Sequence, residues 1–261
     1  MPPAASETIA RVQQHLHTLR LMGVESVPVG VRPTPHMQVE AKPDLPVSVA
    51  REPAASASGS VSEPVVDADA ALDEVRARYE ADAPHAAFVT NFQSIVFGEG
   101  DPNADLMFIG EAPGAEEDKT GRPFVGRAGQ LLEKMIVAMG LARERVYIAN
   151  VLKTRPPNNA TPTSEEARAC APYLFDQIRV VRPRVIVTLG LPATRVILES
   201  TASMGQLRGR WGGLELDASD RYPAIEVAVM PTYHPAYLLR SYTPENRGKV
   251  WSDLQMAMER L

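Results

Sequence analysis

Cysteine is almost missing from this sequence of 261 residues, in which Cys170 is the only one. A single thiol excludes a disulfide within the chain and any metal site built from the cysteines of one chain alone. Long apolar runs are missing too, since no stretch of about 18 apolar residues is available to span a membrane as a helix. The N-terminus lacks a basic segment followed by an apolar core, so we expect no signal peptide and a cytoplasmic protein.

Positive charge is scarce for a protein that would bind nucleic acid, because the net charge is −5 at pH 7. The acidic excess lies mainly at the front of the chain. Residues 1–80 carry a net charge of −4, whereas residues 82–261 carry −1. A nearly neutral domain still has room for a basic face. The charge therefore does not exclude a C-terminal part that binds DNA.

The chain divides into three segments by composition. Residues 1–23 are predicted to form an amphipathic helix, with Ser6 as its N-cap and Gly23 at its end. This helix either docks on its own domain or binds a protein partner, and both interpretations stay open. Residues 24–66 are rich in Pro, Ala, Ser and Val, which predicts a flexible linker. Residues 67–261 are predicted to form the folded domain, and we expect a monomer.

Strand and helix patterns alternate through most of the predicted domain. This alternation predicts an α/β fold with a parallel sheet that is covered by helices on both faces. The predicted strands lie at residues 106–109, a short apolar run, and at residues 147–152, 184–189 and 225–230. The predicted helices lie at residues 67–82, 128–139, 164–180, 192–199 and 245–260. Thr163 or Ser164 is the expected cap of the third helix, with Glu166 nearby.

Three polar motifs stand where predicted strands end. They are residues 110–114 (GEAPG), Asn150, and residues 232–235 (TYHP). Ligands of parallel sheets bind beyond the carboxyl ends of the strands. The pattern therefore predicts that these motifs meet at one site.

The GEAPG motif predicts a tight turn with exposed backbone N–H groups, because two glycines and a proline follow a strand. Such a turn is able to hold an acceptor atom of a base or to position a water. An ordinary connection between a strand and a helix explains the motif equally well, so its signal is weak by itself.

A second motif places an aromatic residue in a polar loop, at residues 120–129 (TGRPFVGRAG). Phe124 has little local core to join, and a ring held there is suited to stack on a flat ligand such as a nucleobase. Arg122 and Arg127 flank it and are candidates for phosphate contacts. The alternative is a loop phenylalanine that is tucked into the domain.

Asn150 is a candidate for reading a base, because an amide offers both an acceptor and donors. This combination matches the O4 and N3–H edge of uracil, whereas cytosine presents the inverse pattern there. The competing interpretation is an asparagine that bonds its own backbone at a turn.

His234 precedes Pro235, which fixes the turn after the last predicted strand. A histidine aimed at a departing base is able to donate a hydrogen bond to an oxygen that gains negative charge. A lone histidine is more often structural, so the motif carries weight only together with the others.

Together these motifs resemble the family 4 uracil-DNA glycosylases. The resemblance is carried in order by residues 97–132, 150–163 and 233–240, and it extends from about residue 83 to the C-terminus. It implies a three-layer α/β/α sandwich with a central, mainly parallel four-stranded sheet. It also implies an enzyme that extrudes deoxyuridine from uracil-containing DNA and hydrolyses the bond between base and sugar, which starts base-excision repair.

The resemblance implies a role for each residue of the pocket. Phe124 would stack on uracil, and Asn150 would bind its Watson–Crick edge. His234 would stabilise the departing anion. Gly110 and Glu111 would line the pocket, with Glu111 orienting a water. The reaction of this superfamily is dissociative and needs no metal ion.

DNA contacts are implied for a second group of residues. Arg122 and Arg127 flank the base-binding loop as candidates for phosphate contacts. Leu238, Leu239 and Arg240 would lie in the loop that probes the duplex and fills the space left by the extruded base.

The sequence departs from this family at its iron–sulfur site. Family members carry four cysteines that bind a [4Fe–4S] cluster. Here the corresponding positions hold Thr154, Cys170 and, in an approximate register, Ala83 and Ala86. One thiolate cannot hold a cluster, so we predict that the cluster is absent and that packing fills its space. The bulk is expected from nearby side chains, namely His85, Phe88 and Phe92.

Two other functions remain open from sequence. One is a non-catalytic DNA-binding or scaffold protein on the same fold, which recruits partners through the N-terminal helix. The other is a glycosylase for another deaminated base, such as hypoxanthine or xanthine. An assay for abasic sites on uracil-containing DNA distinguishes the non-catalytic protein from a uracil-DNA glycosylase. A panel of deaminated bases distinguishes a glycosylase for another base from one for uracil.

Overall fold

The fold is known from a computed structural model that describes residues 67–88 and 91–261. The predicted N-terminal helix, with its possible protein partner, and the predicted linker lie outside these residues. Among the helices of the described ranges, none is both long and apolar enough to cross a membrane.

The described chain forms a six-stranded sheet with the strand order β1-β3-β2-β4-β6-β5. The four inner strands are parallel, whereas β1 pairs with β3 and β5 pairs with β6 in antiparallel fashion. The strands are β1 (Glu99–Gly100), β2 (Leu106–Gly110), β3 (Tyr147–Asn150), β4 (Val185–Leu189), β5 (Gly212–Leu216) and β6 (Ile225–Thr232).

The prediction of four strands therefore needs a correction at both edges of the sheet. The four predicted strands are the four parallel inner ones, whose apolar runs are buried from both faces. The two additional strands carry weaker signals. β1 has only two residues, and β5 begins with two glycines and alternates exposed with buried positions. Such edge strands lack the continuous apolar run by which the inner strands were recognised.

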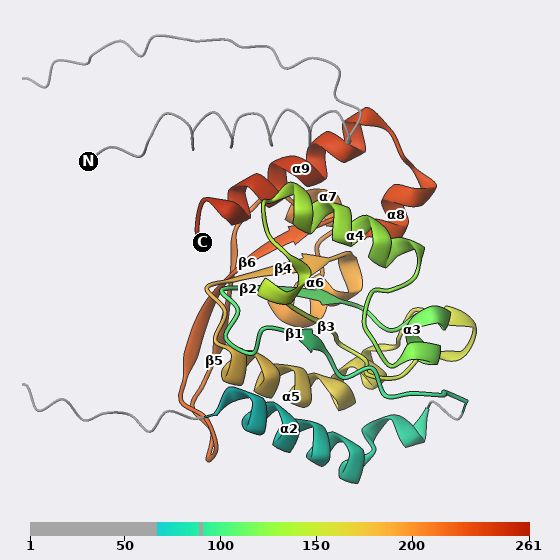
Figure 1. The fold of residues 1–261 in the computed structure, drawn as a ribbon, viewed down its shortest axis with the longest axis vertical. Coiled ribbons are helices and arrows are strands. Elements are labelled where there is room, and N and C mark those ends of the chain that lie inside the picture. The colour runs from blue at the N-terminus through green and yellow to red at the C-terminus, as the bar shows by residue number, and fades with distance from the viewer. Residues whose placement is uncertain (1–66, 89–90) are drawn as a thin grey trace, which may run out of the picture.

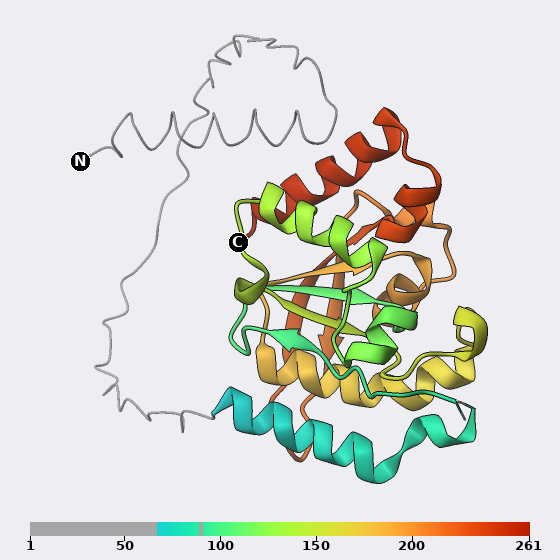
Figure 2. The ribbon, with the colours of Figure 1, turned by 45° about the vertical axis from the view of Figure 1, so that its right-hand side comes forward.

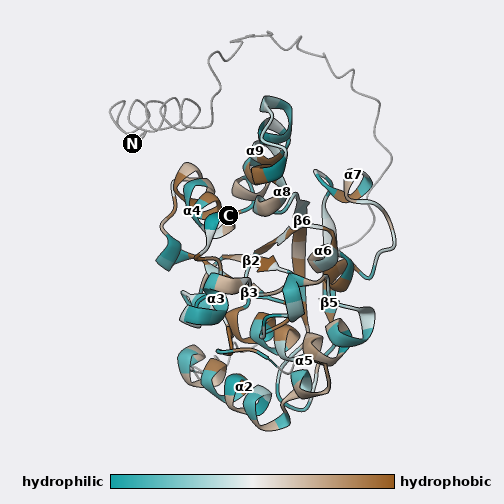
Figure 3. Cartoon of the chain, turned by 90° about the vertical axis from the view of Figure 1, so that its right-hand side faces the viewer, coloured by the Kyte–Doolittle hydropathy of each residue, from teal (hydrophilic) through white to brown (hydrophobic). Residues whose placement is uncertain are grey.

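Helices cover both faces of the sheet and complete a three-layer α/β/α sandwich, as predicted (Figures 1 and 2). In chain order the helices are α2 (Ala68–Asp82), α3 (Ala115–Thr120), α4 (Arg127–Ala138), α5 (Ser164–Val181), α6 (Leu191–Leu198), α7 (Met204–Leu207), α8 (Pro235–Arg240) and α9 (Pro244–Met258). Short 3₁₀ turns are η1 (Pro84–Ala87), η2 (Arg143–Arg145) and η3 (Pro157–Asn159). The hydropathy view shows α3 and much of α2 as largely hydrophilic on the outside of the molecule (Figure 3).

Alternation along β2 divides the core into two layers. Met107 and Ile109 belong to a cluster with α2, α5 and α6, whereas Leu106 and Phe108 belong to a cluster with α4, α8 and α9. Successive side chains of a strand point to opposite faces, so one strand supplies both layers. The apolar burial on both faces fixes the register of the inner strands.

Helix α5 begins where the sequence predicted. The Oγ1 of Thr163 accepts a hydrogen bond from the Glu166 N–H at 3.2 Å, and the Glu166 carboxylate accepts one from the Thr163 N–H at 2.6 Å. This reciprocal cap satisfies two N–H groups that the first turn leaves without helical partners. It fixes the start of the long helix that supports β3.

The parallel register brings the predicted motifs to one edge. Gly110 on β2 lies opposite Asn150 on β3, and Leu189 on β4 lies opposite Thr232 on β6. The loops that follow these strands therefore leave the sheet on the same side. This edge carries the candidate site.

Candidate active site

A cavity of about 660 Å³ opens at the carboxyl ends of the parallel strands. Its lining includes Glu111 after β2, Asn150 at the end of β3 and His234 after β6. Phe124 joins them from the loop between α3 and α4. A neighbouring cavity of about 750 Å³ shares Glu111 with the first. The structure thus brings together four of the side chains selected from the sequence.

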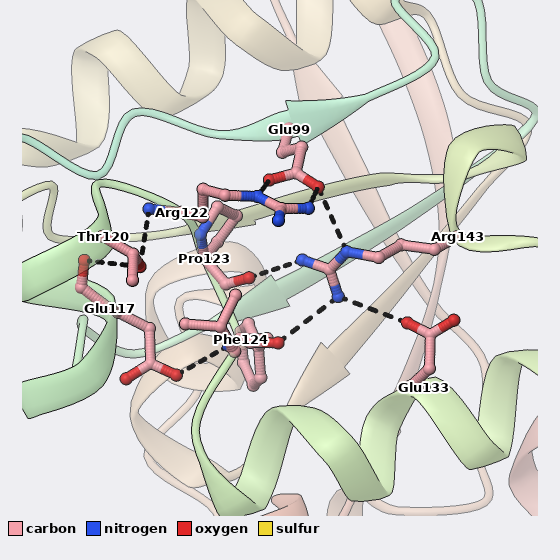
Figure 4. A network of polar contacts seen from close by, with 9 residues as sticks. Glu99, Glu117, Thr120, Arg122, Pro123, Phe124, Glu133 and Arg143 are labelled. Atoms are coloured by element: carbon pink, nitrogen blue, oxygen red, sulfur yellow. Dashed lines mark hydrogen bonds and ion pairs between the residues drawn. The ribbon is translucent and has the colours of Figure 1, made fainter.

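Phe124 is held in a conformation that an L-residue rarely adopts, with φ at 51°. The side chain is buried, and its ring centroid lies 5.7 Å from that of His234 at an interplanar angle of 31°. The Arg143 guanidinium donates hydrogen bonds to the carbonyl oxygens of Pro123 and Phe124. Figure 4 shows these contacts together with those of Glu117. The strained backbone is therefore fixed from outside the loop.

Glu117 is a buried carboxylate to which the sequence analysis assigned no role. It accepts hydrogen bonds from the N–H groups of Val125 at 2.9 Å and Gly126 at 2.8 Å. It also accepts one from the Gly114 N–H at 3.1 Å. One carboxylate thus ties the GEAPG turn to the Phe124 loop. The local signal was an acidic residue in the first turn of a short helix, which surface helices also show.

Gly110 has no room for a side chain. A Cβ built there would lie 2.3 Å from the Oδ1 of Asn150 and 2.5 Å from the Cζ of Phe124. Both distances are far below van der Waals contact. The absence of a side chain therefore allows the ring and the amide to approach each other over the turn.

We expect Gly110→Ala to abolish the activity of the site while the fold is retained. The new methyl group would displace the Phe124 ring and the Asn150 amide from the pocket. Circular dichroism and an activity assay measure the two effects. Gly213→Ala is the matched control, because a Cβ built there meets nothing within 4 Å in the described chain beyond Gly213 and its two chain neighbours. Wild-type activity in Gly110→Ala would contradict this account of the pocket.

Asn150 presents a buried acceptor. Asn150 is 1% exposed, and its Oδ1 has no hydrogen-bond partner among the residues that the structure describes. Leaving a buried carbonyl oxygen unpaired is costly, and most such atoms find a donor. An N–H of a bound ligand would satisfy it. The observation favours the base-binding interpretation of Asn150 over a local turn contact.

His234 is arranged to act as a neutral donor. Its Nδ1 accepts a hydrogen bond from the Ala236 N–H at 3.0 Å, so the ring proton lies on Nε2. Burial, and to a smaller extent the charge of Arg240, lower the pKa of His234 to about 4, although Glu117 opposes this shift. The imidazole is therefore uncharged at neutral pH. A Cβ built on Gly190 would lie 3.0 Å from the His234 Cβ, so the glycine leaves room for the histidine at the strand end.

Glu111 stands between the two cavities. Burial raises the pKa of its carboxyl group above the usual range, and a hydrogen bond with Thr161 opposes that rise. A carboxylate with partial desolvation in a cleft is typical of groups that bind or activate water. The structure places Glu111 where the sequence predicted, after β2 and beside the turn.

The residues predicted to contact DNA lie in different environments. Arg122 is exposed, but its Nε and Nη2 donate to the two carboxylate oxygens of Glu99 at 2.7 Å, in a bidentate pair. Arg127 is exposed at the first turn of α4. Leu239 is 37% exposed and Arg240 is exposed beside the cavity.

Leu238 requires a correction. The resemblance implied a loop that probes the duplex, but Leu238 is 1% exposed and packs in the core with α4 and α9. The segment is the helix α8, which has a buried and an exposed side. Tyr237, which was not selected, is 36% exposed and lines the cavity. Helical periodicity thus separates neighbours that the motif had grouped.

The residues at the four implied iron–sulfur positions do not fit a [4Fe–4S] cluster. Thr154 and Cys170 are fully buried, and burial raises the pKa of the Cys170 thiol, which favours its neutral form. Ala83 and Ala86 offer no ligand atom. The Tyr79 hydroxyl occupies the space beside Cys170 and Thr154. Within residues 67–88 and 91–261 no group of three or more His, Cys, Asp or Glu side chains is placed to hold a metal ion.

Aromatic rings fill this region instead. The Tyr79 ring is stacked on His85, with centroids 5.3 Å apart, and meets Tyr173 edge-on at 5.1 Å. Phe92 packs edge-on against His85 at 4.8 Å. Phe88 packs against the core cluster that contains Tyr79. These contacts join α2, η1 and α5.

Comparison with known proteins shows similarity across the domain that carries the cavity. The family model described as "Uracil DNA glycosylase superfamily" matches residues 97–255. The "Type-4 uracil-DNA glycosylase" of Thermotoga maritima is 45% identical over 172 residues, which cover 64% of this chain and 83% of that protein. The protein of the same description from Sulfurisphaera tokodaii is 45% identical over 170 residues, which cover 62% of this chain and 72% of that protein. The protein of this description from Pyrobaculum aerophilum is 44% identical over 165 residues, which cover 63% of this chain and 82% of that protein.

Proposed function

This chain belongs to the uracil-DNA glycosylase superfamily, and from this membership we propose that it flips deoxyuridine out of DNA and releases uracil by hydrolysis. Its similarity to type-4 uracil-DNA glycosylases supports the assignment. The single observation that carries it is the unpaired Oδ1 of Asn150 in a pocket that also holds Phe124 and His234.

The pocket complements uracil at three points. The Oδ1 of Asn150 accepts a hydrogen bond from N3–H of the base, and its NH₂ group donates to O4. Cytosine lacks the N3–H donor and carries a donor in place of O4, so both contacts fail. The Phe124 ring supplies a flat face for the base. The pocket thus selects uracil by hydrogen bonding rather than by size alone.

The bond between C1′ and N1 breaks with its electron pair going to the base. The Nε2–H of His234 donates to O2 of uracil as negative charge develops there. The sugar cation is attacked by a water that Glu111 orients, and the proton of that water is taken up by the carboxylate. The products are free uracil and an abasic site. A neutral histidine suits this role because it donates without giving up its proton.

The test is alkali-sensitive cleavage of oligonucleotides that carry one uracil, as U:A pairs, U:G pairs and single strands. We expect abasic sites from the full chain, and strongly reduced levels from His234→Ala and Asn150→Ala. A panel with hypoxanthine and xanthine measures the range of bases. DNA binding without any base release would instead assign a scaffold role.

Activity is expected to fall on the acid side as Glu111 takes up a proton. Its raised pKa moves this fall to a higher pH than an exposed glutamate would give. Glu111→Gln should be slow and should lack this acidic limb in a profile of kcat/KM against pH. Glu116→Gln removes the same charge from an exposed position of α3 and should keep the wild-type profile. An unchanged acidic limb in Glu111→Gln would rule out this role.

We further propose that the enzyme works without an iron–sulfur cluster. The support is the single thiol of the chain and the burial of Tyr79 beside Cys170 and Thr154. Stacked and edge-on rings take over the connection between α2 and α5. Absorption bands of iron–sulfur charge transfer in anaerobically purified protein would contradict this proposal.

A further inference from the structure

Lys153 is a buried cation directly behind the base-binding residue. It is 0% exposed, and its Nζ donates a hydrogen bond to the carbonyl oxygen of Asn150 at 2.8 Å. The same ammonium donates to the Oε1 of Gln177 on α5. It also lies 5.4 Å from the centre of the Phe97 ring. Both hydrogen-bond acceptors are neutral.

Gln177 connects this ammonium to two further segments. Its Nε2 donates to the Phe97 carbonyl oxygen at 3.0 Å and lies 3.2 Å from the Tyr147 hydroxyl. The Lys153 carbonyl oxygen accepts a hydrogen bond from the Val96 N–H at 2.7 Å. The end of β3, the segment before β1 and α5 are therefore held through one lysine and one glutamine.

The titratable groups around the ammonium do not neutralise its charge. Cys170 approaches it from α5, and the Tyr79 hydroxyl from α2 lies next to Cys170. Burial raises the pKa of both groups, so both are uncharged at neutral pH, as is Tyr147 on β3. Burial lowers the pKa of Lys153 to about 7, against a small opposing effect of Cys170.

A buried lysine with neutral partners is costly for folding, because an apolar side chain of similar length would fill the space without desolvating a charge. A structural staple for the end of β3 does not require a charge. The contact is made to the residue whose side chain carries the unpaired Oδ1. The cost of burying the Lys153 charge is therefore explained if this charge acts on the base that Asn150 binds.

We propose that Lys153 is a positioning residue, whose ammonium fixes the backbone of Asn150 for uracil recognition and places a positive charge behind a base that leaves as an anion. The proposal rests on the proposed function. The ammonium acts through Asn150 and touches neither uracil nor DNA. Its charged form is the active one, because only that form stabilises the developing negative charge across the Asn150 peptide and amide.

The experiment compares Lys153→Met with the wild-type full chain on a single-uracil oligonucleotide, as kcat, KM and their pH dependence. We expect kcat to fall about 100-fold, as for a misplaced catalytic contact, with a smaller change in KM. The wild type should lose activity as the pH rises through the pKa of Lys153, and Lys153→Met should lack this alkaline limb. Tyr79→Phe, which removes a buried hydroxyl in the same region, should keep the wild-type pH profile.

A second variant covers the case in which Lys153→Met does not fold. Gln177→Glu places a carboxylate on the ammonium and raises the pKa of Lys153, so the alkaline limb should move to higher pH. A purely structural role would lower stability without moving this limb. An unmoved limb in Gln177→Glu, or wild-type kcat in a folded Lys153→Met, overturns the proposal. If the wild type releases no uracil, the proposed function itself has failed, which is a different result.

Discussion

Replacing His234 with phenylalanine lowers kcat for uracil release by about 10²–10³-fold, the usual effect of removing one donor to a developing oxyanion. The phenylalanine ring can keep the contact with Phe124 but lacks the Nε2–H that we propose donates to the base. The loss concerns the transition state, so KM should change much less than kcat. Single-turnover kinetics on a uracil-containing oligonucleotide separate the chemical step from binding and product release.

The matched control is His85→Phe. His85 is also a buried imidazole beside an aromatic ring, but it stacks on Tyr79 and does not line the cavity. This variant should keep the wild-type kcat. If both histidine variants lost activity equally, the effect would lie in stability rather than in leaving-group stabilisation. A His234→Phe enzyme with wild-type kcat would show that the neutral imidazole is not the donor.

Asn150→Asp is expected to reduce kcat/KM for uracil by about 10³-fold or more, since sites built on buried hydrogen bonds discriminate by up to about 10⁵-fold. The carboxylate keeps the shape of the amide but loses the NH₂ donor to O4. It also places negative charge against a base that becomes an anion. Steady-state kinetics on single-stranded and U:G substrates measure the effect.

Asn158→Asp makes the same chemical change on the exposed turn η3 and does not line the cavity. Its kcat/KM should stay within a few-fold of the wild type. Undiminished uracil release by Asn150→Asp would remove the base-reading role from Asn150. It would also remove the ground for assigning Lys153 a positioning role.

The four parallel strands at the centre of the sheet were predictable from the sequence, because strands buried on both faces consist mainly of apolar residues. Residues 106–109 are a continuous apolar run and residues 184–189 are mainly apolar, and both proved to be inner strands, apart from small shifts at their ends. The convergence of Gly110, Asn150 and His234 followed from the same reasoning, since parallel strands bring their carboxyl ends to one edge.

Other features depend on contacts between distant segments and left no local signal. The edge strand β1 consists of two residues, and its pairing with β3 depends on the tertiary fold. The motif grouped Leu238 with Leu239, but in the helix α8 Leu238 is buried and Leu239 is exposed. The burial of Lys153 was also hidden, because lysine is normally a surface residue. Its acceptors, Asn150 and Gln177, lie on two elements that only the fold brings together.

The most direct test of the account is the amount of free uracil that the full chain releases from a single-uracil oligonucleotide after treatment with an iron chelator. The account predicts multiple turnovers by protein that contains far less than one iron per chain, because Glu117 and Arg143 hold the Phe124 loop at the pocket and aromatic rings join α2 to α5. Activity that appears only in iron-loaded protein, or no uracil release at any enzyme concentration, would contradict it.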